Sequence, residues 1–379
     1  MKKRFSIRYK LIIVFGLLIV IASSTEGFLA TRTARKAVTE KVEAHLIDKA
    51  TDVAEIIDGR INAVQQFLEG IARMPMFSNP SVSDEEKLAL LKDQVAFNTA
   101  IHELDFSELD GTLHSINGKA QVADRDWFKA ARSGKAFLSE PLFSKTTQKL
   151  IQVIAVPIYD DNHQIIGVLS ADFDGSWLSE QIKDIVVGKT GNCYIMGDTS
   201  NIVADNDIEL VKNQVSIIEK AKTDKELASC ADFLEYVWDT DESEVGYYTY
   251  QGVSYIASFA TMKTTAWSVI IRAPVNEFMG EIDALRISVL GIGIVVISTA
   301  LVIVFFVALA LIKPIRAIVS VLKDISEGEG DLTVRLPVHG NDEITDLSEY
   351  FNQTISKIGS SINQIGLNSS DMENIGNEL

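Results

Sequence analysis

Arg125, Trp127 and Asp172 are the side chains in this sequence best suited to bind a small charged molecule. The guanidinium of Arg125 can hold a carboxylate through two parallel hydrogen bonds, and the Asp172 carboxylate can accept hydrogen bonds from an ammonium group. Trp127 offers an apolar wall with a cation-attracting face, which Phe128 and Phe143 would extend. These groups together suit an α-amino acid, and an amine or another small carboxylate stays open. In the structural alternative, Arg125 holds the fold through ion pairs with Asp124, Asp126 or Asp172.

The secondary structure predicted around these residues gives them defined positions. Arg125 lies in a loop that enters a helix running from Trp127 to Ser133. Asp172 is near the end of a strand predicted from Gln164 to Phe173. Because side chains alternate along a strand, one face carries Val168, Ser170 and Asp172 and the other carries Leu169, Ala171 and Phe173. Asp172 is therefore expected to point away from the more apolar layer and into a cleft.

Catalytic and nucleic-acid-binding signals are absent from the sequence. There is no G-x-x-x-x-G-K-[ST] phosphate loop, H-E-x-x-H pair or G-x-S-x-G turn, and the five histidines are scattered. With 52 Asp and Glu against 35 Lys and Arg, the net charge of −17 argues against nucleic acid as a partner. We therefore expect a protein that is not an enzyme and needs no cofactor or metal.

Two apolar segments have the character of membrane spans. Ile287–Ile312 holds 26 residues without a charge, so as a helix it reaches about 39 Å, enough to cross the hydrocarbon core of a bilayer. The shorter run Leu11–Ala22 follows a cationic segment, residues 1–10. We interpret it as an anchor over 11–30, although a cleaved signal peptide has a similar pattern.

The cations beside the spans predict the topology. Residues 1–10 carry Lys and Arg but no acidic residue, and Lys313 and Arg316 follow the second span. Both ends are therefore expected in the cytoplasm of a multi-pass protein of the inner or plasma membrane, with residues 31–286 outside. In that location Cys193 and Cys230 would form either a disulfide or two separate buried thiols.

The segment between the spans has the pattern of an α+β fold. Apolar residues at intervals of three and four predict a long helix over 31–75. Strand and turn signals then occur twice in the same order, which predicts a membrane-distal unit over 76–187 and a membrane-proximal unit over 188–275. In the second unit we expect core or surface roles, rather than ligand contact, for Tyr194, Asp205, Tyr247, Tyr248 and Tyr255.

This order of elements resembles a double Cache sensor domain, with two stacked PAS-like units on one long helix. The motifs that carry the resemblance are Asp124-Arg-Asp-Trp-Phe128, Ser139-Glu-Pro-Leu-Phe143, Ile166-Gly-Val-Leu-Ser-Ala-Asp172 and Gly188-Lys-Thr-Gly191. Amino-acid sensors of that family use an Arg, a Trp and an Asp in this order with interleaved tyrosines. The resemblance thus implies ligand contact for Arg125, Trp127 and Asp172. Ala120, Phe128 and Phe143 stand where the family has tyrosines, so three hydroxyl groups are missing.

A helical pattern follows the second span. Ile315, Ile318, Leu322 and Ile325 step as in a coiled-coil seam, and the segment from Glu327 to Asp331 breaks the helix. Asn341 can cap a second helix, whose seam runs from Ile344 to Ile365 with one extra step of four residues, a stutter, between Phe351 and Ile355. A single helix cannot bury such a seam, so we expect a four-helix coiled coil in a homodimer. A helix lying on the membrane surface is the alternative.

Residues 313–365 resemble a HAMP domain, in which Pro314 and Glu343 occupy positions implied to transmit the signal. The whole arrangement resembles the front part of a methyl-accepting chemotaxis protein, with residues 366–379 starting its signalling helix. The hairpin that contacts the histidine kinase and adaptor in that family is missing here. The expected function is a chemoreceptor for a small extracytoplasmic ligand. The alternatives are the input half of a sensor histidine kinase or cyclic-dinucleotide synthase, and a stand-alone binding protein.

Overall fold

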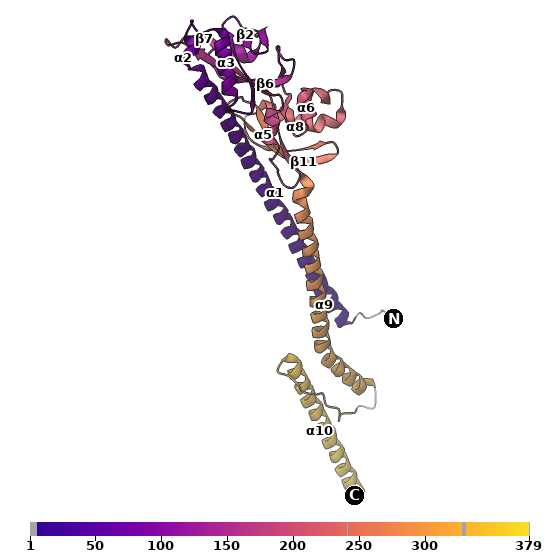
Figure 1. Ribbon diagram of the computed structural model, residues 1–379. Coiled ribbons are helices and arrows are strands. Elements are labelled where there is room, and N and C mark those ends of the chain that lie inside the picture. Colours follow the sequence, from indigo (N-terminus) through magenta and orange to yellow (C-terminus); the bar gives the residue numbers. More distant parts are fainter. Residues whose placement is uncertain (1–5, 241, 328–330, 379) are drawn as a thin grey trace. The chain divides into compact units, whose positions relative to one another are not determined.

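The computed structural model describes residues 6–240, 242–327 and 331–378, and it divides the chain into two compact bodies. The sensor body is Ala34–Asp283, and the helical body combines Met1–Thr33 with Ala284–Leu379 (Figure 1). The predicted helix break at residues 328–330 and the first five residues of the predicted cytoplasmic segment lie outside the described residues.

The first helix, α1, runs without a break over Ile7–Ala72. In the sensor body its apolar stripe is fully buried at Leu46, Ile57, Ile61 and Leu68, which confirms the predicted long amphipathic helix. Pro75 then opens the short helix α2 (Pro75–Ser78), a position where its missing N–H costs nothing. Helix α3 (Asp84–Val95) follows, capped by reciprocal hydrogen bonds between Ser83 and Glu86.

The first α+β unit is built on an antiparallel sheet in the order β3-β2-β1-β7-β6-β4, with β5 also paired to β6. Its strands are β1 (Ile101–Glu108), β2 (Thr112–Ser115), β3 (Gly118–Gln121), β4 (Phe137–Leu138), β5 (Leu142–Phe143), β6 (Leu150–Tyr159) and β7 (Ile165–Asp174). The predicted Asp110-Gly111 turn joins β1 to β2, where Gly111 adopts a φ of +89° that side chains disfavour. Two short helices, α4 (Asp126–Arg132) and α5 (Trp177–Ile182), complete the unit.

The two faces of this sheet pack into different cores, as the alternation along β7 predicts. Leu169, Ala171 and Phe173 join the large core that contains the buried stripe of α1. Val168 joins a smaller core on the opposite face, together with Trp127 and Phe128 of α4. Ser170 and Asp172 share that second face, so the predicted division of the strand is confirmed.

The second α+β unit has a five-stranded antiparallel sheet in the order β10-β11-β12-β8-β9. Its strands are β8 (Asn192–Met196), β9 (Ile202–Ala204), β10 (Val245–Tyr250), β11 (Val253–Thr261) and β12 (Ser268–Pro274), close to the predicted hairpins. Helices α6 (Ile208–Lys212), α7 (Ile217–Ala221), η1 (Lys225–Leu227) and α8 (Ala228–Asp239) were not predicted. Cys193 and Cys230 are both buried and free, so the structure has two separate thiols.

Asp58 connects α1 to the loop between β11 and β12. Its buried carboxylate accepts hydrogen bonds from the backbone N–H groups of Lys263 (2.8 Å) and Thr264 (3.0 Å) and from the Thr264 hydroxyl. Asp58→Ala would leave these donors without their charged acceptor and is expected to lower the unfolding free energy by about 2–3 kcal/mol. Urea unfolding of the detergent-solubilised chain measures this. Glu55→Ala, which breaks only an exposed ion pair with Lys263, should cost less than about 0.5 kcal/mol. Equal losses in the two variants would contradict this role of Asp58.

The helical body contains two helices long and apolar enough to cross a membrane. The apolar stretches of Ile7–Ala72 and Ala284–Glu327 reach mean hydropathies of 2.1 and 3.1. At Gly16 an added Cβ would lie 3.1 Å from the Leu301 side chain, so glycine allows close packing of the two helices there. Helix α9 extends over Val275–Glu327 and contains Pro314 in its interior, so the proline lies in a continuing helix.

The segment after α9 is extended and then enters α10 (Glu343–Glu378). The Asn352 side chain of α10 fixes the extended segment, since it accepts from Leu336 N–H and donates to the Leu336 carbonyl, both at 2.8 Å. Asn341 was expected to cap this helix, but Asp342 does so, with its carboxylate accepting the backbone N–H of Thr345 at 2.9 Å. The carboxylate suits the positive helix end better than an amide does.

Candidate ligand-binding site

A cavity opens on the second face of the first sheet, next to α4. It has a volume of about 300 Å³, including the part open to solvent. Its lining combines acidic, basic, hydroxyl and apolar side chains: Asp105, Leu113, Val122, Arg125, Trp127, Leu142, Ser144, Lys145, Ile151, Val153, Ser170 and Asp172. A mostly apolar concavity with a few polar groups is the usual form of a small-molecule site.

The register of three neighbouring strands places the acidic side of the cavity. β1 pairs with β7 so that Glu103 lies beside Asp172, and Asp105 beside Ser170. β7 in turn pairs with β6, where Val153 lies beside Asp172. Because alternate residues face the same side, Glu103, Asp105 and Asp172 come together over an apolar floor. Oxygen atoms of the three carboxylates all lie within 4.8 Å of one another.

Burial and nearby charges raise the pKa values of two members of this acidic group, Asp105 and Asp172. Desolvation and the charges of Asp172 and Glu103 raise the pKa of Asp105 to about 10. Desolvation and the charge of Glu103 raise the pKa of Asp172 to about 7. Glu103 accepts hydrogen bonds from the Ser115 hydroxyl and, at 2.7 Å, from the Asn117 amide. Asp105 Oδ1, by contrast, is buried without a partner among the described residues, so a ligand donor would satisfy it.

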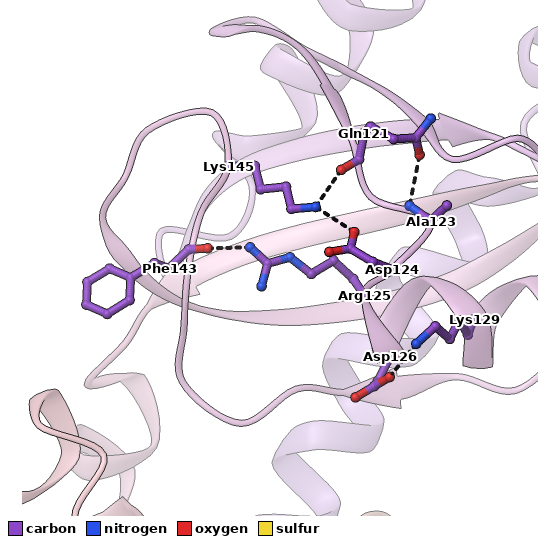
Figure 2. Close-up of polar contacts among 8 residues, drawn as sticks. All are labelled: Gln121, Ala123, Asp124, Arg125, Asp126, Lys129, Phe143 and Lys145. Atoms are coloured by element: carbon purple, nitrogen blue, oxygen red, sulfur yellow. Dashed lines mark hydrogen bonds and ion pairs between the residues drawn. The ribbon is translucent and has the colours of Figure 1, made fainter.

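The basic side of the cavity faces this acidic group. Arg125 precedes α4, and its Nη2 donates to the Phe143 carbonyl at 2.8 Å (Figure 2). Lys145 contacts Asp124 at 2.5 Å and the Gln121 carbonyl at 2.8 Å. Within the described part of the chain no carboxylate lies within 4.0 Å of the Arg125 guanidinium. The expected alternative, in which Arg125 forms an ion pair with a neighbouring aspartate, is therefore not what the structure shows. Most of the five guanidinium donors stay free for a ligand.

The aromatic residues predicted for the site occupy different places. Trp127 lines the cavity, and its indole N–H is buried without a partner among the described residues. Phe128 is fully buried and packs edge-on against Trp127, with ring centroids 6.2 Å apart. The Phe143 ring is 54% exposed and points away from Arg125 (Figure 2), so only its carbonyl contributes here. The structure thus brings Arg125, Trp127 and Asp172 to one cavity, and ligand contact by all five residues stays a prediction.

Sequence reasoning missed part of this cavity, namely Asp105, Lys145 and Ser144. A signal for Asp105 was present, because Glu103, Asp105 and Ser107 alternate with apolar residues and must share one strand face. Lys145 and Ser144 lie in the loop between β5 and β6, where no periodic pattern predicts which way a side chain points. Their contribution depends on how that loop folds over α4.

Of the two residues predicted to transmit a signal, Pro314 lies inside α9 and Glu343 is the exposed first residue of α10. Glu343 suits the positive end of the helix. The structure describes one arrangement of each, so a role in transmission stays a prediction.

A two-unit α+β body on a long helix, with a charged cavity in its first unit, defines an input module of the ligand-binding type. The family model of the Cache domain (dCache_1) matches residues 30–282, more than half of the chain, and the chain belongs to this family. The HAMP domain model matches residues 306–360. Both matches agree with the resemblance found in the sequence.

Proteins similar in sequence to this chain include methyl-accepting chemotaxis proteins. The methyl-accepting chemotaxis protein TlpA of Bacillus subtilis is 25% identical over 92% of this chain and 51% of its own length. McpG of Pseudomonas putida, of the same class, is 22% identical over 96% of this chain and 56% of its own. The chain therefore spans about half the length of the curated relatives it matches. Among solved structures, the ligand-binding domain of the Pseudomonas fluorescens chemoreceptor CtaA, in complex with L-isoleucine, superimposes with a TM-score of 0.52 at 18% identity. It covers 66% of this chain and 99% of that domain, and at this identity it shows the fold.

Proposed function

We propose that this chain is the sensing and membrane part of a methyl-accepting chemotaxis receptor. In this proposal a small extracytoplasmic ligand, an amino acid or a related carboxylate or amine, binds the cavity of the first unit. Arg125 holds its carboxylate, Asp172 and Asp105 receive its ammonium group, and Trp127 covers its apolar part. The observation that carries the proposal is the combination of groups in one cavity: Arg125, which has no carboxylate within 4.0 Å among the described residues, and the two buried carboxyl groups of Asp105 and Asp172.

Support for a receptor rather than another use of the cavity comes from the relatives. TlpA and McpG are named as chemotaxis proteins, and CtaA was solved with L-isoleucine bound in a domain of this fold. The distribution of cations beside the two apolar helices supports a cavity on the extracytoplasmic side of the membrane. A reporter fused near Asp172 should therefore be active outside the cytoplasm, and activity in the cytoplasm would contradict this topology.

Signal transfer in this proposal needs a second copy of the chain. On α10 the seam residues Ile358, Ile362 and Ile365 are 43%, 55% and 67% exposed, while Ile355 is buried. An apolar seam of this kind is stable when a partner helix covers it, which favours a homodimeric coiled coil. Ligand binding would then shift the balance between two packings of this coil. A chain that stayed strictly monomeric in lipid nanodiscs would contradict the mechanism.

A ligand screen on the full chain in nanodiscs tests the proposed function. Amino acids, amines and small carboxylates are added one at a time, and thermal unfolding is followed. A ligand at about one hundred times its Kd should stabilise by about 2.7 kcal/mol, which raises the melting temperature by about 5–10 °C for a body of this size. The proposal fails if no member of the three classes shifts the melting temperature.

A further inference from the structure

A second cavity lies in the second α+β unit, between its sheet and the helices α6 to α8. Its volume is about 240 Å³, including the part open to solvent. The space is smaller than that of the first cavity, so it suits only a small ligand. The lining residues are Tyr194, Ile202, Asp205, Leu210, Ile217, Cys230, Leu234, Tyr250 and Arg272.

Arg272 of β12 provides the cation of this cavity. The guanidinium carbon lies 5.0 Å from the ring centroid of Tyr194, 5.2 Å from that of Tyr250 and 5.1 Å from that of Tyr255. Its Nε donates to the Asn192 side chain at 2.8 Å, which fixes the side chain in this place. The guanidinium also donates a hydrogen bond to the Tyr248 hydroxyl, and its remaining terminal N–H groups lie at a position that aromatic rings hold rigidly.

Arg272 interacts with the charge of Asp205 but forms no ion pair with it. Among the residues that the structure describes, no carboxylate lies within 4.0 Å of the guanidinium. Asp205, the acidic residue of the cavity, is buried and accepts the backbone N–H of Asp207 at 2.8 Å instead. Burial raises the pKa of Asp205, while the hydrogen bond from Asp207 and the charge of Arg272 act in the opposite direction. A cation that is partly removed from water, without a paired anion, favours an anionic ligand.

The rest of the lining suits an apolar group. Ile202, Leu210, Ile217 and Leu234 face the cavity from β9 and the helices, and the phenols of Tyr194 and Tyr250 complete its walls. The cluster of carboxylates that marks the first cavity has no counterpart in this lining, where Asp205 is the acidic residue. The lining thus offers a site for a carboxylate group and an alkyl chain, and little to bind an ammonium group.

We propose that the second unit binds a short-chain monocarboxylate, with its carboxylate on Arg272 and its alkyl chain against Leu210, Ile217 and Leu234. This site is separate from the cavity of the first unit, so the receptor would read two ligands of different chemistry on one sensor body. Tyr194 and Asp205, which the sequence placed in core or surface roles, would then belong to a binding site.

Calorimetric titration of the full chain in nanodiscs with sodium propionate tests the proposal. Propionate should bind, and neutral propionamide, which has the same shape, should bind at least about 10-fold more weakly because it lacks the charge. Arg272→Gln should weaken propionate binding by about 30-fold or more, whereas Arg272→Lys keeps the charge without the planar fork and should weaken it less. Lys129→Ala, which removes an exposed charge of the first unit, should leave propionate affinity unchanged within about twofold.

A second variant tests the same site if the Arg272 variants fail to fold. Leu210 is partly buried at the edge of the cavity, so Leu210→Phe fills the space for the alkyl chain and leaves Arg272 in place. It should also weaken propionate binding by about 10-fold or more without lowering the melting temperature of the unliganded chain. Three results would each overturn the proposal: no binding of millimolar propionate, equal binding of propionamide, or binding that is lost in Arg125→Ala and kept in Leu210→Phe.

Discussion

Replacing Arg125 by Ala is expected to remove almost all of the stabilisation that a ligand of the first cavity confers. The guanidinium lines the cavity, has no carboxylate partner among the residues that the structure describes, and is positioned by its hydrogen bond to the Phe143 carbonyl. Losing the charged donors to a ligand carboxylate should weaken binding by about 2–4 kcal/mol, or about 30- to 1,000-fold in Kd. At a concentration that saturates the wild type a hundredfold, the gain of about 2.7 kcal/mol then falls towards zero.

The measurement is thermal unfolding of wild type and variant in nanodiscs, with and without the strongest ligand of the screen. Lys129→Ala is the matched control, since Lys129 lies on the same helix and forms an exposed ion pair with Asp126 at 3.0 Å (Figure 2). Its ligand-induced shift should equal that of the wild type. If Arg125→Ala keeps the full shift, Arg125 is not part of the site.

Asp105→Asn is expected to stabilise the unliganded protein above neutral pH. The pKa values of Asp105 and Asp172 in the folded state, about 10 and about 7, lie above the ordinary 3.8 of an unfolded aspartate. The folded protein therefore holds extra protons, so the stability they contribute is complete below about pH 4 and decreases as pH rises. Asp172 loses its contribution through about pH 7 and Asp105 through about pH 10. Each proton contributes a slope of about 1.4 kcal/mol per pH unit at most.

Between pH 5 and 7 both aspartates lower the unfolding free energy as pH rises, so Asp105→Asn should halve this decrease. Between pH 7 and 9 only Asp105 contributes, so the variant should nearly abolish the decrease. At pH 8 the variant should be more stable than wild type by about 2–4 kcal/mol, because the amide keeps the shape of the neutral carboxyl group. Urea unfolding across this pH range gives the slopes. Asp110→Asn is the control of opposite sign: hydrogen bonds from Thr112 lower the pKa of Asp110, so its contribution changes only at acidic pH. Parallel wild-type and Asp105→Asn curves would rule out the buried proton.

Much of the fold follows from periodicity along the chain. Intervals of three and four residues predicted α1 through Ile57, Ile61 and Leu68, and alternation predicted that Asp172 and Ser170 share a face of β7. The short helices α6 and α7 escaped prediction because segments of five residues hold too few turns for a helical period. The N-cap of α10 was misplaced by one residue because Asn341 and Asp342 are both good caps, and their sequence order does not choose between them.

The sequence by itself determined the helices that can cross a membrane, the two α+β units, and three residues that meet at one cavity, Arg125, Trp127 and Asp172. Only the tertiary structure shows that Asp105 lies beside Ser170 and that Asp124 pairs with Lys145. It also shows the Arg272 guanidinium among tyrosine rings with no ion-pair partner in the described part of the chain. The physical reason is that a strand's period fixes which face a side chain takes, whereas its neighbours depend on which strand pairs with it and in what register. That register is set by the burial of whole sheet faces, a sum over contacts between residues far apart in the chain.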